Sequence, residues 1–352
     1  MISLYLDEYS VLSSLPTQFT IDQVNGWVRV RIILQGKEIY STTLYENNGS
    51  TIFYGFKDII RENMLARGLT LASLTVAAEE EMGGEYYRDK YIIFAEVYDM
   101  DDERDMIWAR FLTNRSFYVV PRGGILPLSF FSDGSEQFSA FADCVFKEED
   151  GSINTYTYTH PVSRQNLPKV YGLYLYLDDI ERYVQRTEGG SVGKLLSLTF
   201  HVGKRSMTVY VSDEPYEVDF TFRNSFNVYE RIYIYGSTKL KSTFDRKEAV
   251  SQGIISFYDM AVERKYQVET APMGLEEAEW FNEFLASHYV YRELNQDWEP
   301  TVLISDITSE ISDNAKDLVK MKFSWRYDNN ARWIDTNSYP QMFSKPYNDA
   351  FK

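Results

Sequence analysis

Four side chains of the types that carry nucleophilic, acid–base or metal chemistry are scattered along the sequence: His160, His201, His288 and Cys144. Histidines that bind one metal ion recur at characteristic spacings, and these three share none. His201 alternates within a predicted strand, which is typical of a surface or half-buried residue. Cys144 lies inside the alternating run 141–146, which favours a small buried core residue over a reactive thiolate. We therefore expect neither catalysis nor metal binding from these four residues.

Two acidic segments could supply the clustered oxygen atoms that Ca²⁺ prefers. The first is Asp99–Asp105, and the second comprises Asp306, Glu310, Asp313 and Asp317. The first segment lacks the glycine that an EF-hand loop needs at its sharp turn, and we interpret both segments as solvated loops. A glycosidase pair of carboxylates stays open among 52 acidic residues, but no pair stands out. Ca²⁺ binding stays open too, and we otherwise predict no cofactor.

Recognised catalytic motifs are absent from the sequence. It contains no G-x-S-x-G elbow, P-loop, G-x-G-x-x-G or H-E-x-x-H pattern. The six tryptophans offer flat faces on which sugar rings could stack: Trp27, Trp108, Trp280, Trp298, Trp325 and Trp333. Trp280 adjoins the apolar face of a predicted helix, and Trp325 belongs to an alternating strand, so we expect both in the core. A carbohydrate-binding surface on the others stays open.

A polar knot interrupts the aromatic stretch FRNSFNVYERIYIYG. Its members are Arg223, Asn224, Ser225, Phe226 and Asn227. The flanking segments 216–222 and 228–235 alternate apolar and polar residues, as strands do. Asparagine tolerates the left-handed backbone region and hydrogen-bonds to nearby backbone, so we predict a tight corner between two strands with Phe226 in the core beneath it. An interface role for Arg223 stays open.

The composition favours folded β structure and excludes some partners. The chain has 352 residues, 44% of them apolar, with 28 Tyr and 22 Phe. Aromatic residues favour pleated, half-buried surfaces, and tyrosine also suits hydrated interfaces. The net charge of -16 argues against nucleic acid and anionic membrane as partners, because both need a basic face. The same charge favours solubility at high local concentration.

The single cysteine allows no intramolecular disulfide, which fits a reducing cytoplasm. The start MISLYLDEYSVLSS lacks a basic n-region and carries Asp7 and Glu8, so we expect no secretory signal. No run of about 18 apolar residues predicts a membrane span.

Periodicity predicts a mainly β protein made of antiparallel β-sandwich domains. The predicted hairpins are 27–34 with 39–45, 138–146 with 153–159, and 195–202 with 206–211. Further strands are predicted at 69–76, 91–98, 216–222, 228–235, 254–260, 266–270, 301–306 and 318–325. One short helix is expected at 56–65, in the N-terminal half. One clear helix is expected at 275–288, where apolar residues recur at helical spacing.

The segment 161–170 contains two prolines and is the predicted domain boundary. We expect an N-terminal β-sandwich region at 1–165, which could itself consist of two subdomains split near 85–90. A second β-sandwich with the helix 275–288 would occupy 166–327. The remainder, 328–352, is expected to form an extended C-terminal arm.

In the order of its features, the sequence resembles a family of tail-associated proteins, of the tail tip or baseplate, encoded by phages and prophages of Bacteroidetes. The resemblance covers nearly the whole chain. It runs through MISLYLDEYSVLSSLP, YENNGSTIFYGFKDIIRENM, FLT at 111–113, PRGG at 121–124, LSFF at 128–131, FRNSFN, TAPMGLEEAEWFNEFLASHYVY, VLISDITSEISDNAKDLVKMKFSWR and PQMFSKPYNDAF. The most specific pieces are Phe222–Phe226 and Glu269–Tyr291 with Ile304–Asp306. Val228 departs from the pattern, because an aromatic or Cys-Trp element is expected near the corner. Whether any site at the knot carries over therefore stays open.

The resemblance implies a non-enzymatic structural component of the virion, at the tail tip, baseplate or distal-tail collar, made and assembled in the host cytoplasm. The implied partners are other copies of the chain, in a ring or another symmetric homo-oligomer, and neighbouring tail proteins. An extended arm could order on a neighbour. The resemblance leaves copy number, tail morphology and the neighbours' identity open.

Two other hypotheses stay open beside this one. The chain could be a carbohydrate-binding module for host surface polysaccharide, on a virion or otherwise, with a role in host attachment. It could also be an enzyme such as a glycan hydrolase, which we rank last because no catalytic constellation emerges.

Overall fold

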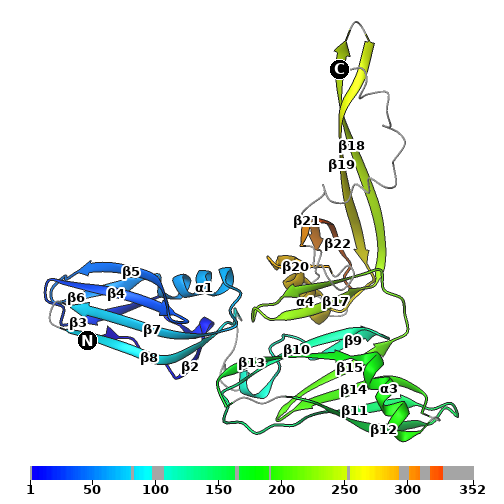
Figure 1. Ribbon diagram of the computed structural model, residues 1–352, viewed down its shortest axis with the longest axis horizontal. Helices are drawn as coiled ribbons and strands as arrows, with labels where there is room; N and C mark the ends of the chain where they lie inside the picture. The colour runs from blue at the N-terminus through cyan, green and yellow to red at the C-terminus, as the bar shows by residue number, and fades with distance from the viewer. Residues whose placement is uncertain are drawn as a thin grey trace, which may run out of the picture. The chain divides into compact units, whose positions relative to one another are not determined.

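The computed structural model describes residues 2–80, 83–96, 107–162, 166–189, 192–251, 254–292, 301–309 and 318–327. As predicted, the fold is mainly β, with several antiparallel sheets in sandwich-like domains. Contacts divide the chain into two compact units (Figure 1). Unit 1 comprises Met1–Glu214 and Arg223–Arg231, and unit 2 comprises Pro215–Phe222 and Ile232–Lys352.

The first part of unit 1 contains a five-stranded and a three-stranded sheet. The five-stranded sheet has the order β2 (Tyr9–Val11), β8 (Gly83–Ile93), β7 (Leu71–Glu80), β4 (Trp27–Leu34) and β5 (Lys37–Tyr45). The three-stranded sheet has the order β1 (Ile2–Ser3), β3 (Gln18–Asp22) and β6 (Ser50–Tyr54), and the 3₁₀ turn η1 is Leu12–Ser14. Every second residue of β4 is buried, so its alternating sequence gives one core-facing and one outward face.

The predicted N-terminal helix is confirmed as α1 (Phe56–Ala66). Phe56, Ile60 and Met64 recur every four residues, and all three are fully buried in the core of the two sheets. The helix ends at Ala66, with Arg67 as its C-cap, and β7 begins at Leu71.

The second part of unit 1 contains a five-stranded sheet and a paired β10 and β13. The sheet has the order β12 (Ile153–His160), β11 (Ala140–Lys147), β14 (Lys194–Val202), β15 (Arg205–Ser212) and β9 (Phe117–Pro121). β10 is Ile125–Ser132, β13 is Lys169–Tyr176, and the two pair along their whole length. Helix α3 (Leu177–Glu188) follows β13 directly and contacts β12. Helix α3 was not among the helices predicted from the sequence.

The structure divides the chain at a different place from the predicted boundary at 161–170. β10 pairs with β13, β11 with β14, and β9 with β15, so hydrogen-bonded ladders cross the predicted boundary three times. The two prolines flank a connection inside one unit, and the division falls at Glu214. The suggested split near 85–90 also differs from the structure, because β8 runs through it. The predicted arm 328–352 lies outside the described residues.

Unit 2 contains the second predicted helix, α4 (Leu275–Ala286), which confirms that prediction. Its three-stranded sheet has the order β17 (Tyr229–Ile234), β16 (Val218–Arg223) and β20 (Val290–Tyr291). Its four-stranded sheet has the order β18 (Gly236–Ser251), β19 (Ile254–Thr270), β22 (Met321–Tyr327) and β21 (Val302–Ser309). Trp280 and Trp325 are buried among phenylalanine rings, as predicted.

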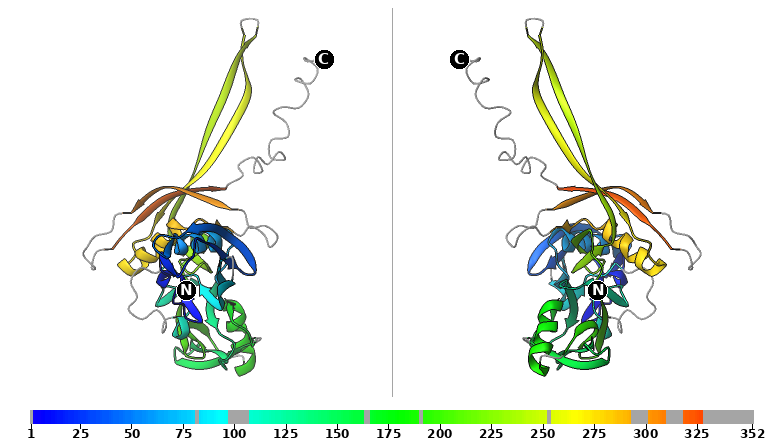
Figure 2. Two further views of the ribbon diagram at one scale, coloured as in Figure 1. Left: turned by 90° about the vertical axis from the view of Figure 1, so that its left-hand side faces the viewer. Right: turned by 90° about the vertical axis from the view of Figure 1, so that its right-hand side faces the viewer.

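β18 and β19 form a long two-stranded ribbon that extends well beyond the other strands of its sheet (Figures 1 and 2). They pair from Gly236 and Thr270 to Ser251 and Ile254, whereas β22 pairs only with residues 266–269 of β19. We name residues 241–265, the part of the ribbon beyond the pairing with β22, the arm; it is distinct from the predicted C-terminal arm 328–352. In the part of the chain that the structure describes, the two strands of the arm pair only with each other.

None of the helices among the described residues is long and apolar enough to cross a membrane.

Candidate functional site

The polar knot is a tight corner between β16 and β17, as predicted. The backbone N–H of Asn227 donates to the carbonyl oxygen of Asn224 at 2.8 Å, and the N–H of Asn224 donates to the carbonyl oxygen of Val228 at 3.0 Å. Asn227 has a φ of 57°, in the left-handed region that asparagine tolerates better than most residues. Residues 223–231 of the corner belong to unit 1.

The side chain of Asn224 holds the corner from inside. Its Nδ2 donates to the carbonyl oxygen of Leu112 at 2.8 Å and to Oε1 of Glu230 at 2.6 Å. Its Oδ1 accepts from the N–H groups of Phe226 at 3.0 Å and Val228 at 3.2 Å. Both donors and both acceptor sites of this amide are therefore used within the protein. Asn224 builds the corner and is not available to a ligand.

Phe226 lies in the core beneath the corner, which confirms its predicted position. It is 3% exposed and belongs to an apolar cluster with Ile93, Leu112 and Phe131. The carbonyl oxygen of its neighbour Ser225 accepts from the N–H of Glu96. The corner is thus fixed to unit 1 by apolar contacts and by backbone hydrogen bonds.

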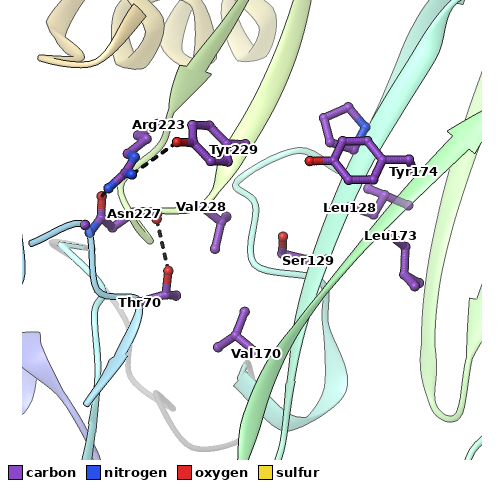
Figure 3. A pocket seen from close by; sticks show the side chains of 13 residues that line it. Thr70, Leu128, Ser129, Val170, Leu173, Tyr174, Arg223, Asn227, Val228 and Tyr229 are labelled. Atoms are coloured by element: carbon purple, nitrogen blue, oxygen red, sulfur yellow. Dashed lines mark hydrogen bonds between the residues drawn. The ribbon is translucent and has the colours of Figure 1, made fainter. Parts of the chain in front are cut away.

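Arg223 lies on the outer side of the corner, over the ring of Tyr229 (Figure 3). Its Nη2 donates to the Tyr229 hydroxyl at 3.1 Å, and its Nη1 donates to Oδ1 of Asn227 at 3.2 Å. Asn227 in turn donates to the carbonyl oxygen of Leu69, and the Thr70 hydroxyl donates to the carbonyl oxygen of Asn227. These contacts tie the corner to the segment between α1 and β7.

Replacing Gly68 by alanine is expected to destabilise unit 1 and displace Arg223. Gly68 has a φ of +62°, and an added Cβ would lie 2.3 Å from Nη1 of Arg223. The left-handed backbone costs about 1–2 kcal/mol for a residue with a side chain, and loss of the Arg223 contacts adds to it. Gly49→Ala is the matched control, because Gly49 has a φ of +77° and open space around it. Urea unfolding should show a larger loss for Gly68→Ala, and equal losses would contradict this account.

A pocket of about 220 Å³ opens beside Arg223. Its polar side chains include Thr70, Ser129, Asn227 and the tyrosine Tyr174, and Figure 3 shows Tyr174 and Tyr229 on different sides of Ser129. No aspartate, glutamate or histidine lines it. The lining can therefore hydrogen-bond and stack against a small polar ligand, but it supplies no carboxylate or imidazole for acid–base chemistry.

A buried polar group lies behind the corner. Glu230 is 2% exposed and accepts from Asn224. Tyr118 is 3% exposed, and its hydroxyl lies 2.8 Å from the hydroxyl of Thr113. Burial raises the pKa of Tyr118 well above its ordinary range, and the nearby Glu230 raises it further. Tyr118 therefore stays protonated at neutral pH and can donate to Glu230, which gives the group a structural role.

The three histidines do not come together. His160 pairs with Ala140 and His201 pairs with Phe141, so the two histidines project from opposite faces of one sheet. Burial lowers the pKa of His160. His201 stacks on Phe141, with Nε2 3.5 Å from Oδ2 of Asp143, and is half-buried as predicted. His288 is exposed just beyond α4.

Cys144 is expected to be unreactive in the native protein. It is fully buried in β11, as predicted, and burial raises the pKa of its thiol to about 12. The thiol is thus protonated and shielded at neutral pH, whereas the thiolate is the nucleophile. Ellman's reagent should label it only when guanidinium chloride unfolds the chain. Labelling of the native protein at the rate of a free thiol would contradict this prediction.

The predicted acidic segments are only partly described. Asp306 has a φ of 51° and forms an ion pair with Lys265. Asp99–Asp105, Glu310, Asp313, Asp317, Trp298 and Trp333 lie outside the described residues. Within the described ranges, no group of three or more His, Cys, Asp or Glu residues is arranged to hold a metal ion. Trp27 is 39% exposed, and Trp108 packs against the cluster that contains Phe226.

No protein-family model matches the chain, and no curated protein matches it either. Among solved structures, the full extracellular region of plexin A4 aligns with 90% of this chain at 10% identity and a TM-score of 0.19. The alignment covers 35% of the plexin chain. A likeness this weak carries no argument about fold or function.

Proposed function

We propose that this chain is a non-enzymatic structural protein that assembles through protein–protein contacts. The observation that carries the proposal is the arm of β18 and β19. Eleven residue pairs, from Lys241–Lys265 to Ser251–Ile254, lie beyond the pairing with β22. An isolated two-stranded ribbon is at best marginally stable in water, and long unpaired strand edges are ready to pair with other chains. An element of this kind is suited to binding a partner.

The residues of the corner, 223–230, also favour a structural role over a catalytic one. Its asparagine side chains are used on backbone groups and on Glu230, and Phe226 is used in packing. The residues that first suggested a site therefore serve to hold the fold together. The pocket beside them lacks an acid or a base.

We place this assembly in a phage tail, as a component of the tail tip, baseplate or distal-tail collar. The resemblance of the sequence to tail-associated proteins of Bacteroidetes phages supports this placement. The net charge of -16 and the single, buried cysteine suit a part that stays soluble in a reducing cytoplasm until it assembles.

Two measurements test the proposal. Sedimentation velocity of the purified chain should show a symmetric oligomer, and addition of candidate tail proteins should give larger complexes. Antibodies against the chain should label the tail in electron micrographs of phage particles. A monomer at every concentration that binds no tail protein would overturn the structural proposal. A self-assembling protein that is absent from phage particles would overturn only the placement in a tail.

A carbohydrate-binding module is the second candidate, and the pocket beside Arg223 favours it. Tyr174 is 50% exposed and supplies an aromatic face near the Ser129 hydroxyl, a combination that suits a sugar ring. Tyr174→Ala should abolish retention on a glycan array if this function is correct. Tyr176→Ala is the matched control, because Tyr176 lies two residues along β13, is 47% exposed and does not line the pocket. Failure of the native chain to bind any glycan would exclude it.

A further inference from the structure

The arm has two chemically different faces. Residues that pair directly across two strands share a face, and alternate residues lie on opposite faces. Leu240 pairs with Tyr266, and Phe244 pairs with Val262. Leu240 and Phe244 therefore lie on one face, which we name the apolar face. Lys239, Lys241 and Lys247 alternate with them and lie on the opposite face.

The apolar face is open to solvent. Leu240 is 53% exposed and Phe244 is 56% exposed. Ile255, near the tip, is 65% exposed, and it pairs with position 250 of β18, beyond the register shift at 247–248. Position 250 is six residues from Phe244 along β18, so Ile255 lies on the same face. At the base of the ribbon the same face is covered, because Tyr266 stacks on the buried Trp325 at 4.1 Å. Among the described residues nothing covers Leu240 and Phe244, and the paired Ser242 and Arg264 lie between them on this face. Large exposed apolar side chains gathered on one face of a strand pair mark an interaction site.

Charge favours a second copy of this chain as the partner. Two chains with a net charge of -16 repel each other, so they can associate closely only where the surface is not acidic. β18 carries four basic residues, Lys239, Lys241, Arg246 and Lys247, against two acidic ones, Asp245 and Glu248. By alternation, Arg246 and Glu248 lie on the apolar face beyond Phe244. Two copies of this face, packed antiparallel, can place opposite charges against each other.

The size of the contact sets its expected strength. Eleven residue pairs at about 3.4 Å rise, with two strands about 4.8 Å apart, give a face of roughly 400 Å². Two stacked faces then bury on the order of 800 Å², below the ~1,200 Å² of the smaller stable interfaces. A contact of this size is typical of weak, transient association.

We propose that the apolar face of the arm packs against the same face of the arm in a second copy of this chain. The proposal rests on the proposed structural function and names its first partner. The contact is isologous, because the same patch is used on both copies. The opposite face, which carries Lys239 and Lys241, remains outward.

Sedimentation velocity of the full-length chain tests this contact over about 1–100 μM, the range in which such a weak contact should form. Phe244→Lys should weaken self-association about tenfold or more, because it places a charge in the apolar centre of the contact. Thr243→Lys is the matched control: Thr243 is exposed and adjacent, lies on the opposite face and pairs with Glu263. We expect it to change the dissociation constant less than about twofold. Ile255→Lys, near the tip, is a second variant of the apolar face. Circular dichroism should show the native fold for all three variants.

Salt separates this contact from an electrostatic one. Added sodium chloride should strengthen the association, because screening the repulsion between two chains of net charge -16 outweighs screening of the few opposite charges within the contact. Weakening by salt would overturn the apolar contact. An oligomer that Phe244→Lys and Ile255→Lys leave intact would overturn the role of the arm but leave the structural function standing. A chain that stays monomeric throughout the range overturns the self-contact, and it overturns the structural function as well if the chain also binds no tail protein.

Discussion

Replacing Phe281 by aspartate is expected to unfold unit 2. Phe281 is 3% exposed on the inner face of α4 and packs against Phe284 at 5.4 Å and Phe323 at 5.8 Å between ring centroids. Phe284 in turn contacts Phe220, so the ring of Phe281 belongs to an aromatic core that joins α4, β16 and β22. The helical spacing of the apolar residues in 275–288 predicts a buried face for this helix, and Phe281 lies on it.

The expected loss of folding free energy is comparable with the whole stability of a typical domain. Truncating a buried phenylalanine costs about 3–5 kcal/mol from lost transfer and the remaining cavity. A carboxylate in the same apolar site adds a desolvation cost of several kcal/mol, since the phenylalanine rings that contact this position offer it no hydrogen-bond donor. The total is comparable with the roughly 5–15 kcal/mol that stabilises a folded domain.

Hydrogen exchange with mass spectrometry resolves this effect by region. Peptides from α4 and β22 should lose protection in Phe281→Asp, whereas peptides from β4 and β14 of unit 1 should keep theirs. Phe281→Leu should retain most of the protection, because it keeps an apolar side chain. Glu279→Asp controls for an aspartate in this helix, since Glu279 is exposed. Native protection of α4 in Phe281→Asp would show that the helix does not depend on this core.

Elements that bury one face were predictable from the sequence, because their buried apolar residues recur with the period of the helix or the strand. α1 and α4 follow the helical spacing of their apolar residues, and β4 follows strict alternation. The same signal was present for α3, where Leu177, Ile180 and Val184 are its buried residues. It was missed because only three apolar positions mark the helix and charged residues occupy most of the rest. A helix that buries so narrow a stripe gives a weak pattern.

The arm was predicted only in part, and the reason is physical. The strands predicted at 254–260 and 266–270 lie within β19, but no strand was predicted for β18, which contains serine, threonine and lysine between isolated apolar residues. Within the described residues, neither face of the arm rests on a core, so the sequence carries no clear contrast between inside and outside. The domain division was missed for a related reason. Prolines mark a break in local structure, but the pairing of β11 with β14 is a long-range choice that local composition does not encode.

The candidate site was predictable as a corner, and only in part as a network. Asparagine chemistry indicated the left-handed turn at Asn227 and the side-chain-to-backbone bonds of Asn224. The partners from distant segments, Leu112, Gly68 and Thr70, had no local signal. Glu230 alternates in phase with Ile232 and Ile234 in β17, so its position faces inward, and this carboxyl group is buried although its charge favours the surface. Its burial depends on the amide of Asn224, which only the fold brings to it.

Replacing Asn224 by aspartate is therefore expected to destabilise unit 1 strongly and in a pH-dependent way. The variant keeps an acceptor for the N–H groups of Phe226 and Val228 but loses both donated hydrogen bonds. It also places a carboxyl group where Nδ2 now lies, 2.6 Å from Oε1 of Glu230. Unpaired buried acceptors and a buried like-charge contact together should cost about 3–5 kcal/mol at neutral pH.

The pH dependence follows from the state of the introduced carboxyl. Burial and the neighbouring Glu230 both disfavour its charged form, so its folded-state pKa should lie above the value of about 3.9 in an unfolded chain. A group with a raised folded-state pKa favours folding below its unfolded pKa, and this contribution is lost as pH rises through the folded pKa. The stability difference between wild type and Asn224→Asp should therefore widen as pH rises from the unfolded pKa through the raised one.

Urea unfolding at a series of pH values between about 5 and 8 measures this widening, with the wild type as the reference at each pH. Asn114→Asp is the matched control. Asn114 lies at the same corner and donates to the hydroxyl of Ser225 at 3.1 Å, but it is exposed. Solvent can hydrate a carboxylate there, so this variant should lose less than about 1 kcal/mol, with little dependence on pH. Similar losses for the two variants would mean that the corner does not depend on a buried amide. A loss for Asn224→Asp that stays constant across the series would mean that the introduced carboxyl keeps an ordinary pKa beside Glu230.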